Sequence, residues 1–380
     1  MKVLHAVIDG EIAGGQTVCL QIIEAFLRDG HQAVVISPSE GPFTELLRKK
    51  EIPVFLIPVQ NTYSFQRAFQ LARLIKREKV DLIHSHGTVP LNIISRLAAK
   101  LSGVPCISHI HAENVFNANP LVRQCQIFLD NWTTQFCYKL IAVSNATKQS
   151  LVKQGIHPDR IEVIVNSIDP NRIRCSQSRE EIFRTFRIDS KKRLIGVIGR
   201  LSPTKGLEDF LKAMREITQQ VPDVVGIIVG EDLEQKGKYQ RELQELSRSL
   251  NLNGAVMFTG FQQDPFSFLN AMEFFVFPSL REGMPLAILE AMCLKKAVVA
   301  THVGGIPEVV QKGETGVLIP PADSGALAQA VLKLLDDPER TKEMGEAGYK
   351  RVKEYFSESR MIDQIRELYQ TAVGTRSILN

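Results

Sequence analysis

The sequence predicts an α/β protein built from two doubly wound parallel-sheet domains. The chain has 380 residues, which exceeds the roughly 250 to 300 residues at which a single core usually stops growing. Short apolar runs alternate with amphipathic stretches of helical period along both halves, and this alternation is typical of βαβ units. A polar stretch at residues 175–181 separates two such series.

Each expected strand is a short apolar run. In the first half the runs are residues 2–8, 32–36, 54–57, 82–84, 106–110, 140–143 and 162–165. In the second half they are residues 194–198, 224–229, 256–259, 274–277, 297–300 and 317–319. From Ser324 onward the pattern is almost wholly helical, and its last segment lies beyond the final strand.

These runs predict the domain boundaries. We expect an N-terminal Rossmann-like domain over 1–178, a C-terminal one over 179–356, and a terminal helix over 357–380 that packs back on the N-terminal domain. Because such sheets bind ligands at the carboxyl ends of their strands, we expect the two domains to face each other across a cleft.

The composition is typical of an ordinary soluble globular protein, and the cysteines lead us to expect a cytoplasmic location. Hydrophobic residues make up 44% and charged residues 23%, so neither disorder nor a membrane span is expected. Six cysteines occur without a C-x-x-C pair, which indicates a reducing compartment and no structural zinc. The first apolar run is too short for a signal peptide, because Asp9 follows it closely.

Positive charge is concentrated in the first half. Residues 1–180 carry 20 Lys and Arg against 15 Asp and Glu, and residues 181–380 carry 26 against 27. An excess of this size is more typical of a solvated surface than of nucleic-acid binding, and we expect no nucleic-acid partner. It suits a domain that meets a phosphorylated acceptor or an anionic membrane surface.

Residues 199–206, Gly-Arg-Leu-Ser-Pro-Thr-Lys-Gly, follow an expected strand and lead into a helix that begins near Leu207. A basic loop before a helix N-terminus is typical of an anion site. Arg200 is a bidentate hydrogen-bond donor and Lys205 a point charge, and the helix adds its first free N–H groups. The alternative is a turn with two solvated cations.

Residues 282–290, Glu-Gly-Met-Pro-Leu-Ala-Ile-Leu-Glu, follow another expected strand. Pro285 marks the first turn of a helix, so Glu282 lies on the loop and Glu290 inside the helix. Glu282, with exposed N–H groups around Gly283 and Met284, could bind sugar hydroxyls, and Glu290 could bind a ribose. The alternative is that both are solvated carboxylates near a helix start.

These two motifs, with residues 142–145, 303–308 and 314–320, resemble the retaining GT-B glycosyltransferases of family 4. The resemblance covers nearly the whole chain, with its elements in the family's order. It implies that Arg200 and Lys205 hold the donor diphosphate and that Glu290 binds the ribose. It also implies that Glu282 meets the donor sugar, together with the loop and helix start at Gly283, Met284, Pro285 and Leu286.

The N-terminal half carries further site candidates. Gly14 and Gly15 lie between the first strand and the first helix, where small residues let a backbone approach a phosphate or sugar. The resemblance implies that this loop closes on the donor from the opposite domain. Counted from Pro105, His111 falls where the family places a histidine that contacts the transferred sugar.

Two H-x-H pairs, His84 with His86 and His109 with His111, end consecutive expected strands. Residues two apart on a strand share a face, which permits a metal site. No Asp or Glu cluster joins them, so we expect sugar contacts or hydrogen-bonded histidines instead. The chain contains no Asp-x-Asp, and we expect it to need neither metal nor cofactor.

Residues 114–138 combine seven large apolar side chains, Val115, Phe116, Leu121, Ile127, Phe128, Trp132 and Phe136, with few charges. We expect helical packing in the core. The alternative is an acceptor lid or a surface that touches a membrane.

Together these features predict a retaining, metal-independent glycosyltransferase. The expected donor is a nucleotide diphosphate sugar, preferably UDP-linked. The expected acceptor is a hydroxyl of a sugar, glycolipid or polysaccharide, as in polysaccharide, lipopolysaccharide or glycolipid synthesis, with peripheral contact to the cytoplasmic face of a membrane. A nucleotide-sugar epimerase and a non-catalytic sugar-nucleotide binder remain as alternatives. A dinucleotide oxidoreductase is disfavoured because no G-x-G-x-x-G follows a strand.

Overall fold

The computed structural model describes residues 1–379 apart from 60, 114–115, 117 and 234. It divides into two compact units. Unit 1 comprises Met1–Asn166 and Glu358–Asn380, and unit 2 comprises Ser167–Ser357. Each unit is an α/β domain around one parallel sheet.

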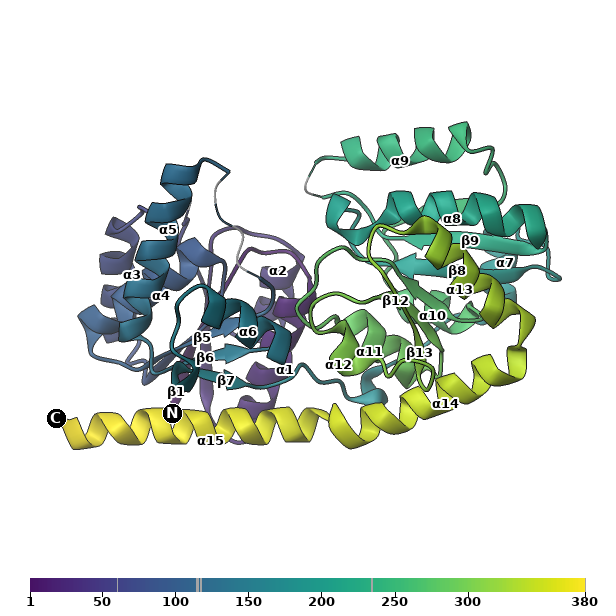
Figure 1. The fold of residues 1–380 in the computed structure, drawn as a ribbon. Helices are drawn as coiled ribbons and strands as arrows, with labels where there is room; N and C mark the ends of the chain where they lie inside the picture. The colour runs from purple at the N-terminus through teal and green to yellow at the C-terminus, as the bar shows by residue number, and fades with distance from the viewer. Residues whose placement is uncertain (60, 114–115, 117, 234, 380) are drawn as a thin grey trace. The chain divides into compact units, whose positions relative to one another are not determined.

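Unit 1 contains a seven-stranded parallel sheet in the order β3-β2-β1-β4-β5-β6-β7 (Figure 1). Its strands are β1 Lys2–Val7, β2 Gln32–Ser37, β3 Val54–Leu56, β4 Leu82–His86, β5 Cys106–Ile110, β6 Lys139–Ala142 and β7 Ile161–Val163. Its helices are α1 Gly14–Arg28, α2 Pro42–Lys49, α3 Gln66–Arg77, α4 Val89–Ser102, α5 Pro120–Thr133, α6 Asn145–Lys153 and α15 Glu358–Leu379.

Alternate residues of β1 supply two cores, one on each face of the sheet. Leu4 and Ala6 pack with α3, α4 and α6, whereas Val7 packs with α1 and α2. The terminal helix α15 joins the second face, where Tyr369 is fully buried and its hydroxyl lies 2.5 Å from His84 Nδ1.

Unit 2 contains a six-stranded parallel sheet in the order β10-β9-β8-β11-β12-β13. Its strands are β8 Arg193–Ile198, β9 Val224–Val229, β10 Val256–Gly260, β11 Phe275–Phe277, β12 Val298–Thr301 and β13 Gly316–Ile319. Its helices are α7 Arg179–Thr185, α8 Leu207–Gln220, α9 Lys238–Ser249, α10 Pro265–Ala271, α11 Leu286–Cys293, α12 Ile306–Val309, α13 Ser324–Asp336 and α14 Pro338–Tyr355.

The predicted fold class is confirmed in both units. Every expected strand is present with bounds shifted by no more than two residues. Unit 1 ends at Asn166, whereas the sequence placed the boundary at 178, because the segment between these positions bonds within unit 2. The Ile168 N–H donates to Phe356 O at 3.0 Å, and the Ser176 hydroxyl donates to Asp264 Oδ2 at 2.5 Å.

The expectation that residues 114–138 pack in the core is wrong for the helix that they form. In α5 the side chains of Leu121, Phe128 and Trp132 are 78%, 67% and 45% exposed. The buried residues of this helix are instead polar, Asp130 and Thr133, because Asp130 pairs with the buried Arg96 at 2.6 Å. Val115 lies outside the described residues.

Across the parts of the chain that the structure describes, no helix is both long enough and apolar enough to cross a membrane.

Candidate active site

Unit 2 brings two of the sequence motifs together at the point where its strand order reverses. The chain leaves β8 toward β9 on one side, and β11 lies on the other. Ligands of such sheets bind outside the carboxyl ends of the strands at this switch point. The loops that follow β8 and β11 meet there, because the Leu280 N–H donates to Thr204 O at 2.8 Å.

An ion pair joins the same two loops. Lys205 Nζ lies 2.6 Å from Glu282 Oε1, and the ammonium also lies 5.3 Å from the centre of the Phe277 ring. The two side chains are 23% and 12% exposed. The structure therefore holds a partly buried cation and a more deeply buried carboxylate in fixed positions, one from each motif.

Two glycines allow the backbone to pack closely around this pair. Gly206, with φ of +63°, caps the start of α8, and a Cβ there would lie 2.1 Å from Pro278 O. Gly304, with φ of +51°, would place a Cβ 1.8 Å from Glu282 O. The Gly305 N–H donates to Gly283 O at 2.8 Å. These contacts fix the loop that carries Glu282, and no larger residue fits at either glycine.

Glu290 lies in α11, on the helix that begins after Pro285. Its side chain is partly buried, and burial raises the pKa of its carboxyl to about 7. A carboxyl with such a pKa changes charge near neutral pH. It is a candidate to accept hydrogen bonds from a ligand, because these bonds would replace the hydration that the carboxylate loses on burial.

The other predicted donor-binding residues of unit 2 differ in exposure. Arg200 is exposed on the loop after β8. Gly283, Met284, Pro285 and Leu286 are buried, although the sequence suggested exposed N–H groups there, because the turn around Gly304 and Gly305 covers this segment.

In unit 1, Gly14 and Gly15 form the first turn of α1 and not a free loop. A Cβ at Gly15 would lie 3.3 Å from His111 Cδ2, whereas one at Gly14 would meet nothing within 4 Å. Gly15 and the partly buried His111 are therefore neighbours. The small residue lets the start of the helix approach the histidine ring.

Two described groups in unit 1 have one possible ligand atom per residue within 4.8 Å of one another: His5, Cys19 and His86, and also His84, His86 and His109. A zinc ion needs nitrogens converging at about 2.0 to 2.1 Å from it. The rings of His84 and His109 are stacked with an angle of 3° between their planes. Stacked parallel rings do not aim in-plane lone pairs at one point, so this arrangement fits a metal poorly.

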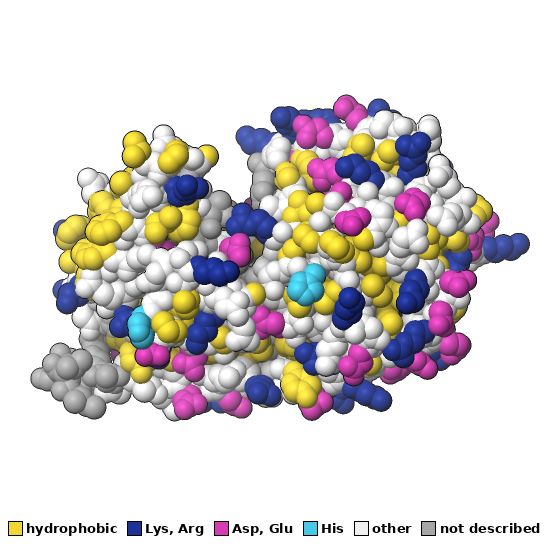
Figure 2. All heavy atoms as spheres, in the orientation of Figure 1, with side chains coloured by type: hydrophobic (Ala, Val, Ile, Leu, Met, Phe, Trp, Pro, Cys, Tyr) yellow, Lys and Arg dark blue, Asp and Glu magenta, His cyan; other side chains and the backbone are white. Residues whose placement is uncertain are grey.

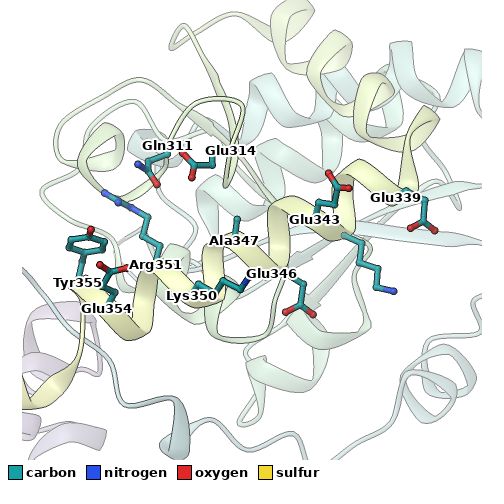
Figure 3. Close-up of a pocket in the computed structure, with 11 residues that line it drawn as sticks. Gln311, Glu314, Glu339, Glu343, Glu346, Ala347, Lys350, Arg351, Glu354 and Tyr355 are labelled. Carbon is teal, nitrogen blue, oxygen red and sulfur yellow. The ribbon is translucent and has the colours of Figure 1, made fainter.

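A surface hollow of about 650 Å³ lies elsewhere in unit 2, along α14 (Figure 3). Its lining contains five glutamates, Glu314, Glu339, Glu343, Glu346 and Glu354, and three cations, Lys342, Lys350 and Arg351. The excess of carboxylates disfavours a diphosphate ligand. None of the site residues predicted from the sequence lines this hollow.

Sequence reasoning missed two features of these sites. It treated Lys205 and Glu282 as separate, although the structure pairs them. It also considered the histidines as two pairs, whereas His5 of β1 joins them through His86, with His5 Nδ1 3.3 Å from His86 Nε2. In both cases the missing signal is strand order, which local spacing does not contain.

Comparison with known proteins identifies the family. Residues 12–172 match the model of Glycosyltransferase Family 4, and residues 178–351 match that of Glycosyl transferases group 1. An Escherichia coli relative, UDP-Gal:alpha-D-GlcNAc-diphosphoundecaprenol alpha-1,3-galactosyltransferase, is 26% identical over 97% of this chain and 96% of its own length. The capsular polysaccharide biosynthesis glycosyltransferase CapM of Staphylococcus aureus is 25% identical, covering 91% of this chain and 92% of its own.

The solved structures show the same fold. The crystal structure of Anabaena HepE in complex with UDP and glucose has a TM-score of 0.86 at 26% identity, and the match covers 98% of this chain and 100% of that one. Each unit contains one parallel sheet, and the two family models match successive parts of the chain. The chain therefore belongs to the family 4 glycosyltransferases of the GT-B fold.

Proposed function

We propose that this glycosyltransferase moves a sugar from a UDP-sugar to a hydroxyl of a membrane-linked acceptor, with retention of anomeric configuration and without a metal ion. The acceptor belongs to glycolipid, lipopolysaccharide or polysaccharide synthesis. Two relatives support the donor and acceptor classes, because one is named for a UDP-Gal donor and a diphosphoundecaprenol-linked acceptor, and another was crystallised with UDP and glucose.

The observation that carries the donor site is the Lys205–Glu282 ion pair at the switch point of unit 2. An ammonium group has three N–H donors, so Lys205 can bond phosphate oxygens while it keeps its contact with Glu282. Arg200, exposed on the same loop, supplies a planar group that can bind a phosphate through two N–H donors.

In the proposed reaction the bond between the anomeric carbon and the phosphate oxygen breaks, and the bond from the acceptor oxygen forms on the same face of the sugar. The acceptor's proton passes to a phosphate oxygen of the departing UDP. Lys205 and Arg200 stabilise the negative charge that grows on the diphosphate. Glu282 binds hydroxyls of the sugar, Glu290 binds the ribose, and Gly14, Gly15 and His111 of unit 1 contact the transferred sugar.

The donor class is tested by ligand-induced stabilisation. A ligand at 100 times its dissociation constant stabilises the folded protein by about 2.7 kcal/mol. We expect UDP and UDP-sugars, but not GDP- or ADP-sugars, to raise the melting temperature of the full chain. Lys205→Ala serves as the matched control and should reduce this shift, by less than its effect on kcat. Equal stabilisation by all three nucleotides would remove the preference for UDP.

The stereochemistry is tested on the first product formed. The donor that stabilises the protein is incubated with a hydroxyl acceptor, and the proton NMR spectrum of the product is recorded before mutarotation. Retention keeps the anomeric coupling of the donor. An inverted centre would contradict the retaining mechanism but would leave the donor site intact, since the thermal shift reports that site separately.

The proposed membrane contact lies on unit 1, where α5 exposes Leu121, Phe128 and Trp132. Figure 2 shows hydrophobic side chains gathered on this part of the molecule. Gln126 of α5 donates to Thr62 Oγ1 at 3.2 Å, which ties the helix to the segment before α3. The residues of α3, Gln66–Arg77, include four cations and no carboxylate, a composition suited to anionic lipid.

Vesicle co-sedimentation tests this contact. The wild-type protein should bind vesicles that contain phosphatidylglycerol, and a variant with Leu121→Ser and Phe128→Ser should bind at least about tenfold more weakly, because each change removes apolar area. Phe261→Ser is the control, since Phe261 is 62% exposed but lies in unit 2. Equal binding by all three proteins would exclude α5 as the contact.

A further inference from the structure

Five of the eight histidines of this chain lie on one face of the unit 1 sheet. His5 is on β1, His84 and His86 are on β4, and His109 and His111 lie at the end of β5. His5 stands opposite His84 in the register of β1 and β4. Because residues two apart on a strand share a face, the five rings gather in one layer. All except the partly buried His111 are at most 5% exposed.

Three of these rings form a continuous hydrogen-bonded chain. His5 Nδ1 lies 3.3 Å from His86 Nε2, and His86 Nδ1 lies 3.1 Å from His111 Nε2. Burial lowers the pKa of His5 to about 3 and that of His111 to about 4, and it also lowers the pKa of His86. The three rings are therefore neutral at neutral pH, and each carries one N–H and one lone pair.

Neutral rings joined in this way have only two consistent arrangements. In the first, His5 Nδ1 donates to His86, His86 Nδ1 donates to His111 Nε2, and the proton of His111 lies on Nδ1. In the second, His111 Nε2 donates to His86, and His86 Nε2 donates to His5, so that His111 Nδ1 has a lone pair. His86 uses both of its nitrogens, so its tautomer decides that of His111.

The hydrogen-bonded chain of rings ends at His111. His111 Nδ1 is buried and has no hydrogen-bond partner among the residues that the structure describes. A buried polar atom without a partner is uncommon and calls for an explanation. A sugar hydroxyl can bond to this nitrogen as donor or as acceptor. Which of the two it does depends on whether the hydrogen-bonded rings leave a lone pair or a proton on His111 Nδ1.

We propose that His86, itself oriented by His5, is a positioning residue that sets the tautomer of His111. Through that tautomer it decides whether His111 Nδ1 donates a hydrogen bond to the transferred sugar or accepts one from it. This inference rests on the proposed contact between His111 and the sugar, and it extends it to two residues that have no role in the proposed donor site.

His109 supplies a matched control within the same cluster. Its ring stacks on that of His111 with centroids 4.2 Å apart, yet neither of its nitrogens has a hydrogen-bond partner within the described part of the chain. It therefore contacts His111 without belonging to the chain. His5 has the opposite properties, because it reaches His111 only through His86.

The test uses the full-length protein with ¹⁵N-labelled histidine. Spectra that correlate ring protons with ring nitrogens distinguish a protonated nitrogen from a bare one, and the signals of His111 are identified by their loss in His111→Gln. We expect His5→Phe and His86→Phe to change the tautomer ratio of His111 about fivefold or more, as the loss of one hydrogen bond allows. His109→Phe should leave the ratio unchanged. If either Phe variant does not fold, His5→Gln and His86→Asn replace them.

An unchanged ratio in both chain variants would overturn the inference, whatever their activity. Kinetics supply the second readout. His5→Phe should lower kcat about fivefold, in proportion to the change in the tautomer ratio. It should leave the Kd of UDP unchanged, because UDP lacks the transferred sugar. A changed ratio with wild-type kcat would overturn the link between His111 and the sugar. The fall in kcat and the weaker UDP binding expected for Lys205→Ala test the donor site independently of both results.

Discussion

The pKa of Glu290 leads to a quantitative prediction about donor binding. Burial raises the pKa of this carboxyl to about 7, and the proposed ribose contact uses the ionised form, which accepts stronger hydrogen bonds than the neutral acid. When a ligand binds only the ionised form, its apparent Kd rises by the factor 1 + 10^(pKa − pH). This factor is about 11 at pH 6 and about 1.1 at pH 8, so UDP should bind about tenfold more weakly at pH 6.

Glu290→Gln separates this effect from the titration of UDP itself. The terminal phosphate of a nucleotide also changes charge near pH 6, and its contribution persists in the variant. The difference between wild type and variant therefore isolates the carboxyl. We expect isothermal titration of UDP to show a steeper pH dependence for the wild type by about tenfold between pH 6 and pH 8, and weaker binding by the variant at pH 8.

The same substitution should stabilise the ligand-free protein at high pH. Because the pKa of the folded state lies above that of the unfolded state, the carboxyl disfavours folding once the pH rises through the range from about 4.5 to about 7. Glu290→Gln removes a penalty of up to about 3 kcal/mol at pH 8, so the melting temperature should rise. Parallel pH profiles for UDP binding in the two proteins, with equal melting temperatures, would refute the burial of a ribose-binding carboxylate here.

Three further predictions concern the same unit. Lys205→Ala should lower kcat roughly a hundredfold or more, with a smaller change in donor KM. Arg200→Lys should also lower kcat, because an ammonium cannot bind a phosphate through two parallel donors. Steady-state kinetics of both variants that match the wild type would remove the diphosphate site from this loop. Gly206→Ala should destabilise by about 2 kcal/mol or more, and clearly more than Gly254→Ala, which has a similar φ but open space around the Cβ. Denaturation that shows equal losses in both would contradict the close approach at Gly206. Transfer should persist in excess EDTA, whereas full loss followed by rescue with magnesium or manganese would show that the cations of this loop do not replace a metal.

The strands were predictable from the sequence because each is a short apolar run with both faces buried. Val224–Val229 is buried throughout. A short apolar run of this kind fits few structures other than a central strand. The pattern of α5 was less informative. Apolar residues at helical spacing indicate a face that favours burial, but whether another element covers that face depends on the tertiary structure. Here a buried pair, Arg96 and Asp130, attaches the polar face of the helix, and the apolar residues remain outside.

The site was predictable as a set of motifs but not as a geometry. The 199–206 loop and the 282–290 element were identified from residue type and spacing. Their contact requires β8 and β11 to be neighbours in the sheet, although β9 and β10 lie between them in the chain. The same holds for His5 and His86. Their strands β1 and β4 are neighbours in the sheet, although β2 and β3 lie between them in the chain. Strand order results from packing of the whole unit, and local pattern does not specify it.

The Lys205–Glu282 pair also bears on how the proposed site would favour the transition state over the bound donor. Glu282 holds the ammonium of Lys205 in place before any ligand arrives, so little reorganisation is needed when the diphosphate binds. It also offsets part of the attraction between Lys205 and the donor in the ground state. The field of Glu282 stays constant while negative charge grows on the departing diphosphate, so the attraction to Lys205 increases along the reaction. An interaction that strengthens toward the transition state raises kcat more than affinity, which is why the expected effect of Lys205→Ala falls on turnover.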